Sequence, residues 1–203
     1  MRELWSQKYK VPDVPEGESG PWKIDSFTVD EDAARLDIID SGARAVRPGT
    51  YKRLTRNGSV IMSDTNVELR DHLFLFGRMK DASSVLIHGL GLGCAVNAAI
   101  LHGVARIDVV ELDADVIKLV GRHYVDKATK SGVQLNIYRG DARTYRFPPG
   151  ASWDAVWHDI WDTICPDNLK TMGTLHRRYE RRCKWQGSWA RPECELVRTG
   201  GRS

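Results

Sequence analysis

From residue 84 onward, short runs of apolar residues alternate with longer segments in which apolar residues recur every three or four positions. The short runs are typical of buried strands, which we expect at 85–88, 107–111, 133–138 and 153–158. The longer segments predict helices at 94–101, 114–124 and 167–184. Strands that alternate with helices favour a parallel sheet covered on both faces, which is a doubly wound α/β fold.

The first third of the chain has a different pattern, in which apolar and polar residues alternate over short distances. This alternation predicts strands at 27–29, at 36–38 and on either side of Asn57-Gly58, a pair that is typical of a two-residue hairpin turn. We therefore expect a small antiparallel β unit, followed by a helix over 66–79.

Composition and length complete the predicted layout. Residues 11–21 are rich in Pro, Gly and acidic residues, so we expect 1–21 to form an extended or mobile arm, with the β unit at 22–65 and an α/β domain at 66–203. Residues 194–198 are predicted as a fifth strand, after which the chain ends. We expect the exposed edge of this short sheet to be covered by the β unit or by a second subunit in a homodimer.

The clearest candidate for chemistry is the turn after the first strand of the α/β domain. Gly89, Gly91 and Gly93 follow that strand directly, and Glu111 ends the next strand about twenty residues later. Glycines let a turn approach a ligand closely, and the helix that follows presents its N-terminal amides. An acid at the end of the next strand can accept hydrogen bonds from both hydroxyls of a ribose. This spacing favours a nucleoside-type cofactor over a purely structural turn.

The order of the motifs identifies a related family. A dinucleotide fingerprint needs a third glycine at position 94, which is Cys here, and the GxGxG pattern instead resembles motif I of the class I S-adenosylmethionine-dependent methyltransferases. Gly140-Asp141-Ala142 matches that family's loop after the third strand, which binds adenine. The resemblance implies a Rossmann-like fold, S-adenosylmethionine as cofactor, and the following cofactor-binding residues: Gly89, Leu90, Gly91, Gly93, Glu111, Leu112, Asp141 and Ala142.

Within this family the chain resembles the spermidine synthase-like branch over residues 50–165. Residues 57–65 resemble that branch's strand entering the active site, residues 111–116 its acidic motif, and Asp159-Ile160-Trp161-Asp162 its DxxD pair. The resemblance implies that Asp159 helps to deprotonate an amine and that Asp162 holds it. Spermidine synthases have an Asp where this chain has Leu92, and leucine cannot pair with an ammonium group. This departure favours methyl transfer to an amine-type acceptor over aminopropyl transfer.

Several candidate residues have alternative interpretations. Asp159 is either catalytic or a strand-end acid that caps a helix, and His158 beside it is a weaker candidate base. Asp113 is equally well explained as a ligand or as a helix N-cap. The side chains of Asp64, Arg70, Asp71 and His72 could reach the cofactor or form salt bridges on a helix face. His176, Cys183 and Cys194 lack zinc-site spacing, so we expect no metal.

Charge distribution leaves a second function open. The net charge of the chain is +3, but residues 170–203 contain nine Lys or Arg and only three Glu. Five of these cations, within Arg177–Lys184, are predicted on one helix and are followed by two tryptophans, an arrangement that can bind nucleic acid. The alternative function is therefore a protein with little catalysis that binds nucleic acid or a protein partner through this segment.

The sequence predicts a cytoplasmic protein. No apolar run approaches the length that spans a bilayer, and the N-terminus lacks the apolar core of a signal peptide. The four cysteines are unevenly spaced, which favours reduced thiols. The methyl acceptor, whether a small molecule or a macromolecule, is not identified by the sequence, because acceptor pockets arise from the variable parts of a fold.

Overall fold

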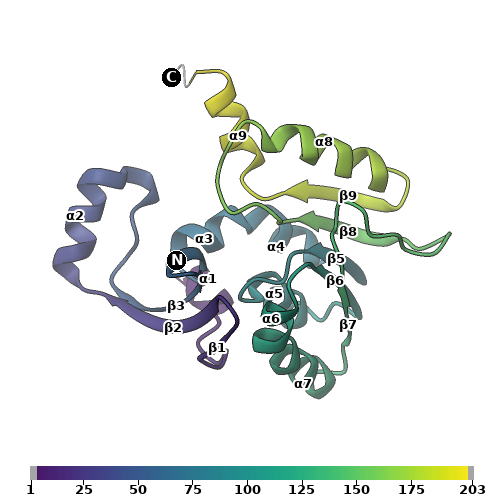
Figure 1. Cartoon of the computed structure of the whole chain (residues 1–203), viewed down its shortest axis with the longest axis horizontal. Coiled ribbons are helices and arrows are strands. Elements are labelled where there is room, and N and C mark those ends of the chain that lie inside the picture. The colour runs from purple at the N-terminus through teal and green to yellow at the C-terminus, as the bar shows by residue number, and fades with distance from the viewer. Residues whose placement is uncertain (1–3, 201–203) are drawn as a thin grey trace.

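The computed structural model describes residues 4–200 and contains two sheets (Figure 1). The larger sheet has five strands, all parallel to their neighbours, in the order β7-β6-β5-β8-β9. Its strands are β5 (Ser84–His88), β6 (Arg106–Glu111), β7 (Gln134–Arg139), β8 (Trp153–His158) and β9 (Cys183–Ser188). The chain order reverses between β5 and β8, and α/β proteins bind ligands at such a reversal. The predicted doubly wound α/β fold is confirmed.

Helices cover both faces of this sheet. On one face lie α4 (Leu73–Met79), α5 (Cys94–Leu101) and the continuous segment formed by α6 (Ala114–Val116), a π-helical turn (Ile117–Gly121) and α7 (Arg122–Lys130). On the other face lies α8 (Asn168–Tyr179), which buries Leu175 and Tyr179 against strand residues such as Leu86 and Val156. The helix predicted over 66–79 is interrupted at His72, so that α3 (Asn66–Asp71) precedes α4 and is capped by Thr65.

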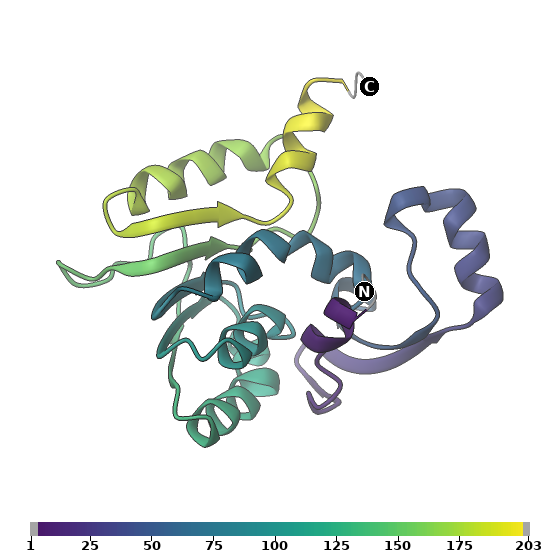
Figure 2. The same cartoon turned by 180° about the vertical axis from the view of Figure 1, so that it is seen from behind.

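The N-terminal unit is a four-stranded antiparallel sheet in chain order, with β1 (Gly17–Ser19), β2 (Trp22–Val29), β3 (Gly49–Arg56) and β4 (Ser59–Ser63). Asn57 and Gly58 both have positive φ, at 50° and 82°, and connect β3 to β4 as the predicted hairpin turn. The far ends of β2 and β3 extend away from the parallel sheet and carry α2 (Glu31–Ser41) and a short 3₁₀ turn (Gly42–Arg44) (Figures 1 and 2).

Two predictions in this region were wrong. Residues 36–38 lie in α2 and not in a strand, because Asp30 caps the helix by accepting a hydrogen bond from the Ala33 amide, and Glu31 and Asp32 occupy its first turn. Leu36 and Ile38 are both exposed, so their alternation marks no buried face. In addition, the described part of residues 1–21 is no extended arm, since it contains α1 (Leu4–Tyr9) and β1.

The C-terminal segment also differs from its prediction. The helix ends at Tyr179, and Cys183–Ser188 forms β9, which pairs in parallel with β8. Residues 194–198 belong to α9 (Arg191–Arg198), which has a proline in its first turn, so the fifth strand precedes the position that we expected. The basic residues of 177–184 therefore do not share one helix, and the Lys184 ammonium pairs with Asp154 at 2.7 Å.

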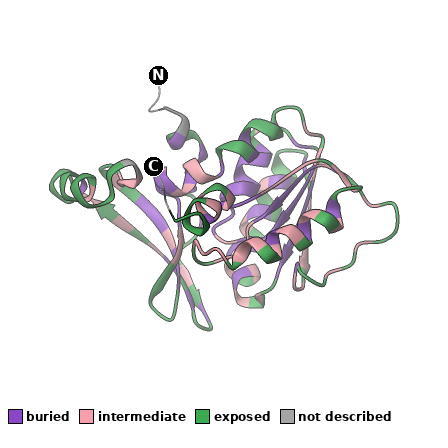
Figure 3. Cartoon of the chain, turned by 90° about the horizontal axis from the view of Figure 1, so that it is seen from above, coloured by how far each residue is buried: buried purple, intermediate pink, exposed green. Residues whose placement is uncertain are grey.

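The edge at β9 is not covered by the N-terminal sheet, which instead packs near the carboxyl ends of the parallel strands (Figure 1). One buried apolar cluster runs through both units: it contains Val11, Trp22 and Leu54 of the N-terminal part together with the apolar interior of the α/β part (Figure 3). All four cysteines are free thiols. Within residues 4–200, none of the helices combines the length and the apolarity that a bilayer span requires.

Candidate functional site

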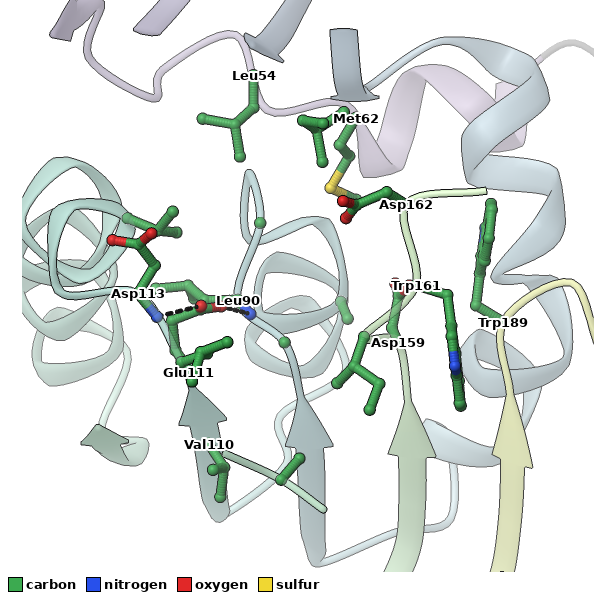
Figure 4. A pocket seen from close by; sticks show the side chains of 18 of the residues that line it. Leu54, Met62, Leu90, Val110, Glu111, Asp113, Asp159, Trp161, Asp162 and Trp189 are labelled. Atoms are coloured by element: carbon green, nitrogen blue, oxygen red, sulfur yellow. Dashed lines mark hydrogen bonds between the residues drawn. The ribbon is translucent and has the colours of Figure 1, made fainter. Parts of the chain in front are cut away.

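A cleft of about 520 Å³ opens at the carboxyl ends of β5, β6, β7 and β8, facing the N-terminal sheet (Figure 4). The parallel strands contribute one wall through the residues that directly follow them, and Leu54 and Met62 of the N-terminal sheet close the opposite side. This is the position at which a parallel α/β sheet binds its ligands, because the strand order reverses here.

The glycine turn forms part of the cleft wall. Gly89 has a φ of 92°, and a Cβ atom at this position would lie 2.0 Å from the Asp159 carbonyl oxygen, so only glycine lets the ends of β5 and β8 approach this closely. Gly89, Leu90 and Gly91 line the cleft, whereas Gly93 packs against the buried Tyr124 ring.

Glu111 is fixed at the end of β6 by the turn that it faces. Its two carboxylate oxygens accept hydrogen bonds from the backbone amides of Leu90, at 2.7 Å, and Asp113, at 2.8 Å (Figure 4). Burial raises the pKa of this carboxyl, although the amide hydrogen bonds oppose the shift. Each carboxylate oxygen has a second lone pair, so the side chain can still accept hydrogen bonds from a ligand hydroxyl. The exposed Leu112 side chain lies beside it on the cleft wall.

Asp141 and Ala142 follow β7 and complete this half of the cleft. The Asp141 carboxylate pairs with Arg143 at 2.8 Å, and the hydrogen bond from Arg143 lowers its pKa. The Asp141 carbonyl closes the turn by accepting from the amides of Thr144 and Tyr145. The Ala142 amide donates to none of the described residues and is available to a ligand.

Asp159 follows β8 and faces the same cleft from its other half. Its Oδ2 atom lies 2.9 Å from Nε2 of His72, a fully buried side chain whose Nδ1 atom lies 2.9 Å from the Glu68 carbonyl oxygen. Burial lowers the pKa of His72, but the hydrogen bond and charge of Asp159 outweigh burial and raise it to about 9. His72 is therefore an imidazolium at neutral pH and pairs with Asp159.

Glu68 is a cleft residue that the sequence did not suggest. Its carboxylate lines the cleft and accepts no hydrogen bond from the described part of the chain. Burial raises its pKa to about 7, with the nearby His72 charge opposing the shift. A carboxyl with this pKa changes its protonation near neutral pH, which suits a group that accepts a proton.

Asp162 lies at the mouth of the cleft and pairs with Arg56 at the end of β3. Arg56 in turn packs over the Trp22 ring, whose Nε1 atom donates to Asp113 at 2.7 Å. Trp161 and Trp189 stand on the same side of the cleft as Asp159 (Figure 4). None of these contacts could be read from the sequence, because each joins segments that lie far apart along the chain.

The remaining candidates lie outside the cleft or have structural roles. His158 is fully buried, and its Nδ1 atom lies 2.8 Å from Nδ1 of His88 on the α8 side of the sheet. Asp113 is the N-cap of α6, where its Oδ1 atom accepts from the Asp115 amide. Asp64 accepts hydrogen bonds from the amides of Val11 and Lys52, and Asp71 pairs with Arg44.

The charges that line the cleft are mostly negative. Seven carboxylates face two arginines and His72; the carboxylates are Glu68, Glu111, Asp113, Asp141, Asp159, Asp162 and Asp167, and the arginines are Arg56 and Arg143. Such a lining attracts a cationic ligand. Within residues 4–200, no three His, Cys, Asp or Glu side chains are arranged to hold a metal ion.

No known family model matches the sequence, and no curated protein matches it. Similar solved structures are methyltransferases. One is a methyltransferase from Geobacter sulfurreducens, with 21% identity and a TM-score of 0.39 over 56% of this chain and 55% of that one. Another is the CcbJ methyltransferase from Streptomyces caelestis, with 16% identity and a TM-score of 0.43 over 56% of this chain and 44% of that one. The chain thus spans about half the length of these structures, and the likeness is one of fold.

Proposed function

We propose that this protein is an S-adenosylmethionine-dependent methyltransferase that acts on an amine-type acceptor. The observation that carries the proposal is the cleft itself. The glycine turn, Glu111 and the Asp141-Ala142 loop converge there from three neighbouring strands, and Asp159 faces them from a fourth. In the proposed function, the first three groups hold the cofactor and the Asp159 half of the cleft holds the acceptor.

The cofactor half fits the chemistry of an adenosyl group. Glu111 has lone pairs for the ribose hydroxyls, the Ala142 amide can donate to adenine, and the Asp141 carboxylate can accept from it. The surrounding carboxylates suit the positive charges of the sulfonium and the amino group. When bound, the cofactor supplies a methyl group that is already activated by its positively charged sulfur. The chain's own residues therefore need chiefly to orient an acceptor in line with that methyl group.

The acceptor half contains groups that can orient an amine and remove its proton. One Asp159 oxygen is held by His72, so the position of the carboxylate is fixed and its other oxygen can accept from the amine. An amine attacks through its lone pair and must release a proton, and Glu68 lies in the same cleft with a pKa near neutrality. Asp162 supplies a further negative charge for a cationic acceptor. His158, outside the cleft, is given no part in the reaction.

Leu92 favours methyl over aminopropyl transfer. Its side chain is fully buried and does not line the cleft, and only its amide approaches the cleft residue Met62. The glycine turn therefore offers no carboxylate to the ammonium group of an aminopropyl donor.

The test is isothermal titration of S-adenosylmethionine and S-adenosylhomocysteine into the protein. We expect micromolar binding that weakens at least tenfold in both Glu111→Gln and Asp141→Asn, because each variant removes a charged hydrogen-bond acceptor. Asp126→Asn is the matched control, since Asp126 is an exposed carboxylate on α7 far from the cleft. Binding that is absent in the wild type, or equal in all four proteins, would refute the cofactor site.

A second assay tests the acceptor. Release of S-adenosylhomocysteine is measured with a panel of primary amines, carboxylates and nucleosides. Turnover confined to amines and reduced in Asp159→Asn supports the proposal, whereas turnover only with another class contradicts the amine assignment. The homodimer also stays a prediction, which size-exclusion chromatography with light scattering would test.

A further inference from the structure

A second, smaller pocket of about 230 Å³ lies away from the cleft, between the β7–β8 connection and the C-terminal end of α8. Its lining is Tyr145, Arg146, Phe147, Arg178, Tyr179 and Arg182. Since a water molecule takes up about 30 Å³ of the liquid, the pocket can hold several waters or one compact polar group.

The three arginines of this pocket have no acidic partners. Within residues 4–200, no carboxylate lies at ion-pair distance from the guanidinium groups of Arg146, Arg178 or Arg182. The charge of Arg178 acts on Asp141, but that carboxylate is already paired with Arg143. Like charges that gather without a counter-charge repel one another, so this arrangement favours an anion between them.

Tyr179 supplies an independent indication of a ligand. Its side chain is only 1% exposed, it lines the pocket, and its hydroxyl forms no hydrogen bond with the described residues. All three arginines line the pocket together with Tyr179, and their charges oppose the burial that raises the pKa of this phenol. This hydroxyl has a proton free to donate, and an oxyanion in the pocket would accept a hydrogen bond from it.

Parts of the pocket wall are held in place before any ligand binds. The Arg178 guanidinium donates to the Ala142 carbonyl at 3.2 Å, and the Arg182 backbone is hydrogen-bonded to both Tyr179 and Trp153. The Tyr179 ring packs against the rings of His88, His158 and Trp153. The Arg178 guanidinium and the Tyr179 hydroxyl therefore lose little conformational freedom when they bind an anion.

We propose that this pocket binds a terminal phosphate group of a small phosphorylated ligand. Guanidinium groups match the geometry of phosphate oxygens, and three of them around one hydroxyl can balance a doubly charged group. The surroundings favour a compact ligand over a nucleic-acid strand, because three of the nearby cations are already engaged: Arg143 pairs with Asp141, Lys184 pairs with Asp154, and Arg177 donates to Thr174. The site is separate from the cleft and does not depend on methyl transfer.

Titration calorimetry with inorganic phosphate and with ribose 5-phosphate, at low ionic strength and matched chloride, tests the site. We expect both to bind, and both to bind about tenfold more weakly to Arg182→Gln. Tyr179→Phe removes only the hydroxyl and should weaken binding several-fold. Arg146→Gln changes an exposed loop residue and should also weaken binding, which keeps the test decisive if a helix variant does not fold.

Arg181→Gln is the matched control, because Arg181 is an exposed neighbour that does not line the pocket. Unchanged phosphate affinity in this variant, with losses in the others, supports the proposal. Equal losses in Arg181→Gln and Arg182→Gln, unchanged affinity in all variants, or no phosphate binding by the wild type would each overturn it. A ten-nucleotide RNA without terminal phosphates is titrated in the same way, to test for nucleic-acid binding. If it bound through these residues more tightly than ribose 5-phosphate, the pocket would belong to a nucleic-acid site and the proposal would be wrong.

Discussion

His72 is held by acceptors at both of its ring nitrogens. The Glu68 carbonyl oxygen can only accept a hydrogen bond, so Nδ1 carries a proton. Nε2 carries the second proton and donates a hydrogen bond to the Asp159 carboxylate. The raised pKa of His72, about 9, follows from this geometry. An imidazolium buried at the back of the cleft fixes the orientation of Asp159.

This pair makes stability depend on pH. Because the pKa of His72 rises from 6.5 to about 9 on folding, its contribution is fully present below pH 6.5 and is lost as the pH rises through about 9. We expect His72→Gln to lose about 3 kcal/mol of unfolding free energy at pH 6, because Asp159 is left without its partner. Between pH 6.5 and 9 the unfolding free energy of the variant should change little, whereas that of the wild type falls. Urea unfolding at pH 6, 7.5 and 9 measures both effects.

Asp159→Asn is the companion variant, since it removes the partner charge and leaves the imidazole. Its stability should also vary less than that of the wild type above pH 6.5. Glu68 affects stability over a lower pH range. Its pKa is raised from 4.5 to about 7, so its contribution to the unfolding free energy is fully present below pH 4.5 and is lost as the pH rises through 7. Parallel pH profiles for the wild type and both variants above pH 7.5 would show that the pair is not ionised.

Some of these cleft residues could be predicted from the sequence, and others could not. Glu111 ends one strand of the parallel sheet, and Asp141 and Asp159 follow two others within two residues, so their common edge follows from the predicted fold. Glu68 and Arg56 reach the cleft only because the N-terminal sheet and α3 pack over that edge. No spacing rule connects Arg56 with Asp162, which lie 106 positions apart.

Within the glycine turn, Gly93 has a packing role that can be separated from its backbone conformation. Its φ is 78°, and a Cβ atom there would lie 2.0 Å from the Tyr124 ring, which is fully buried and donates from its hydroxyl to the Leu92 carbonyl. Gly103 has a similar φ of 70° but open space around it. The two positions therefore form a matched pair.

We expect Gly103→Ala to cost about 1 kcal/mol, which is the strain of a left-handed alanine. Gly93→Ala should cost a further ~1–3 kcal/mol, because the new methyl group displaces Tyr124. Denaturant unfolding of both variants measures the difference. Equal losses would mean that Tyr124 moves aside freely and that Gly93 is needed for its backbone conformation alone.

Helices and strands were predictable where the local pattern and the packing agreed. The strand at Trp153–His158 and the helix at Cys94–Leu101 have the predicted bounds, since most of their residues are apolar and buried. The strand at Cys183–Ser188 was missed because Cys183 continues the helical spacing of the apolar residues Leu175 and Tyr179 in α8. Only the pairing with β8, and the close stacking of Trp185 on Trp157 beside Gly187, makes it a strand.

The two sheets of the molecule share their apolar interior. Tyr9 packs on Phe76 of α4 with ring centroids 4.2 Å apart, and Trp22 and Leu54 belong to the same buried cluster as Val85 and Leu92. Polar contacts join the units as well, since Ser19 donates to Asp115 and Trp22 donates to Asp113. The sequence predicts boundaries at 21/22 and 65/66 from changes in residue pattern, and the shared interior crosses them. Whether the parts unfold separately can be measured.

We expect one cooperative unfolding transition for the whole chain, because neither unit can open without exposing the core of the other. Far-UV circular dichroism and tryptophan fluorescence should give the same urea midpoint. Leu54→Ala, which truncates a fully buried side chain in β3, should lower both midpoints together by an equivalent of about 2–5 kcal/mol. If the N-terminal sheet were an independent unit, Leu54→Ala would split the curves, and limited proteolysis would release a folded fragment beginning near residue 66. The cleft would then lie between two separately stable parts, and cofactor affinity would fall in step with the N-terminal transition alone.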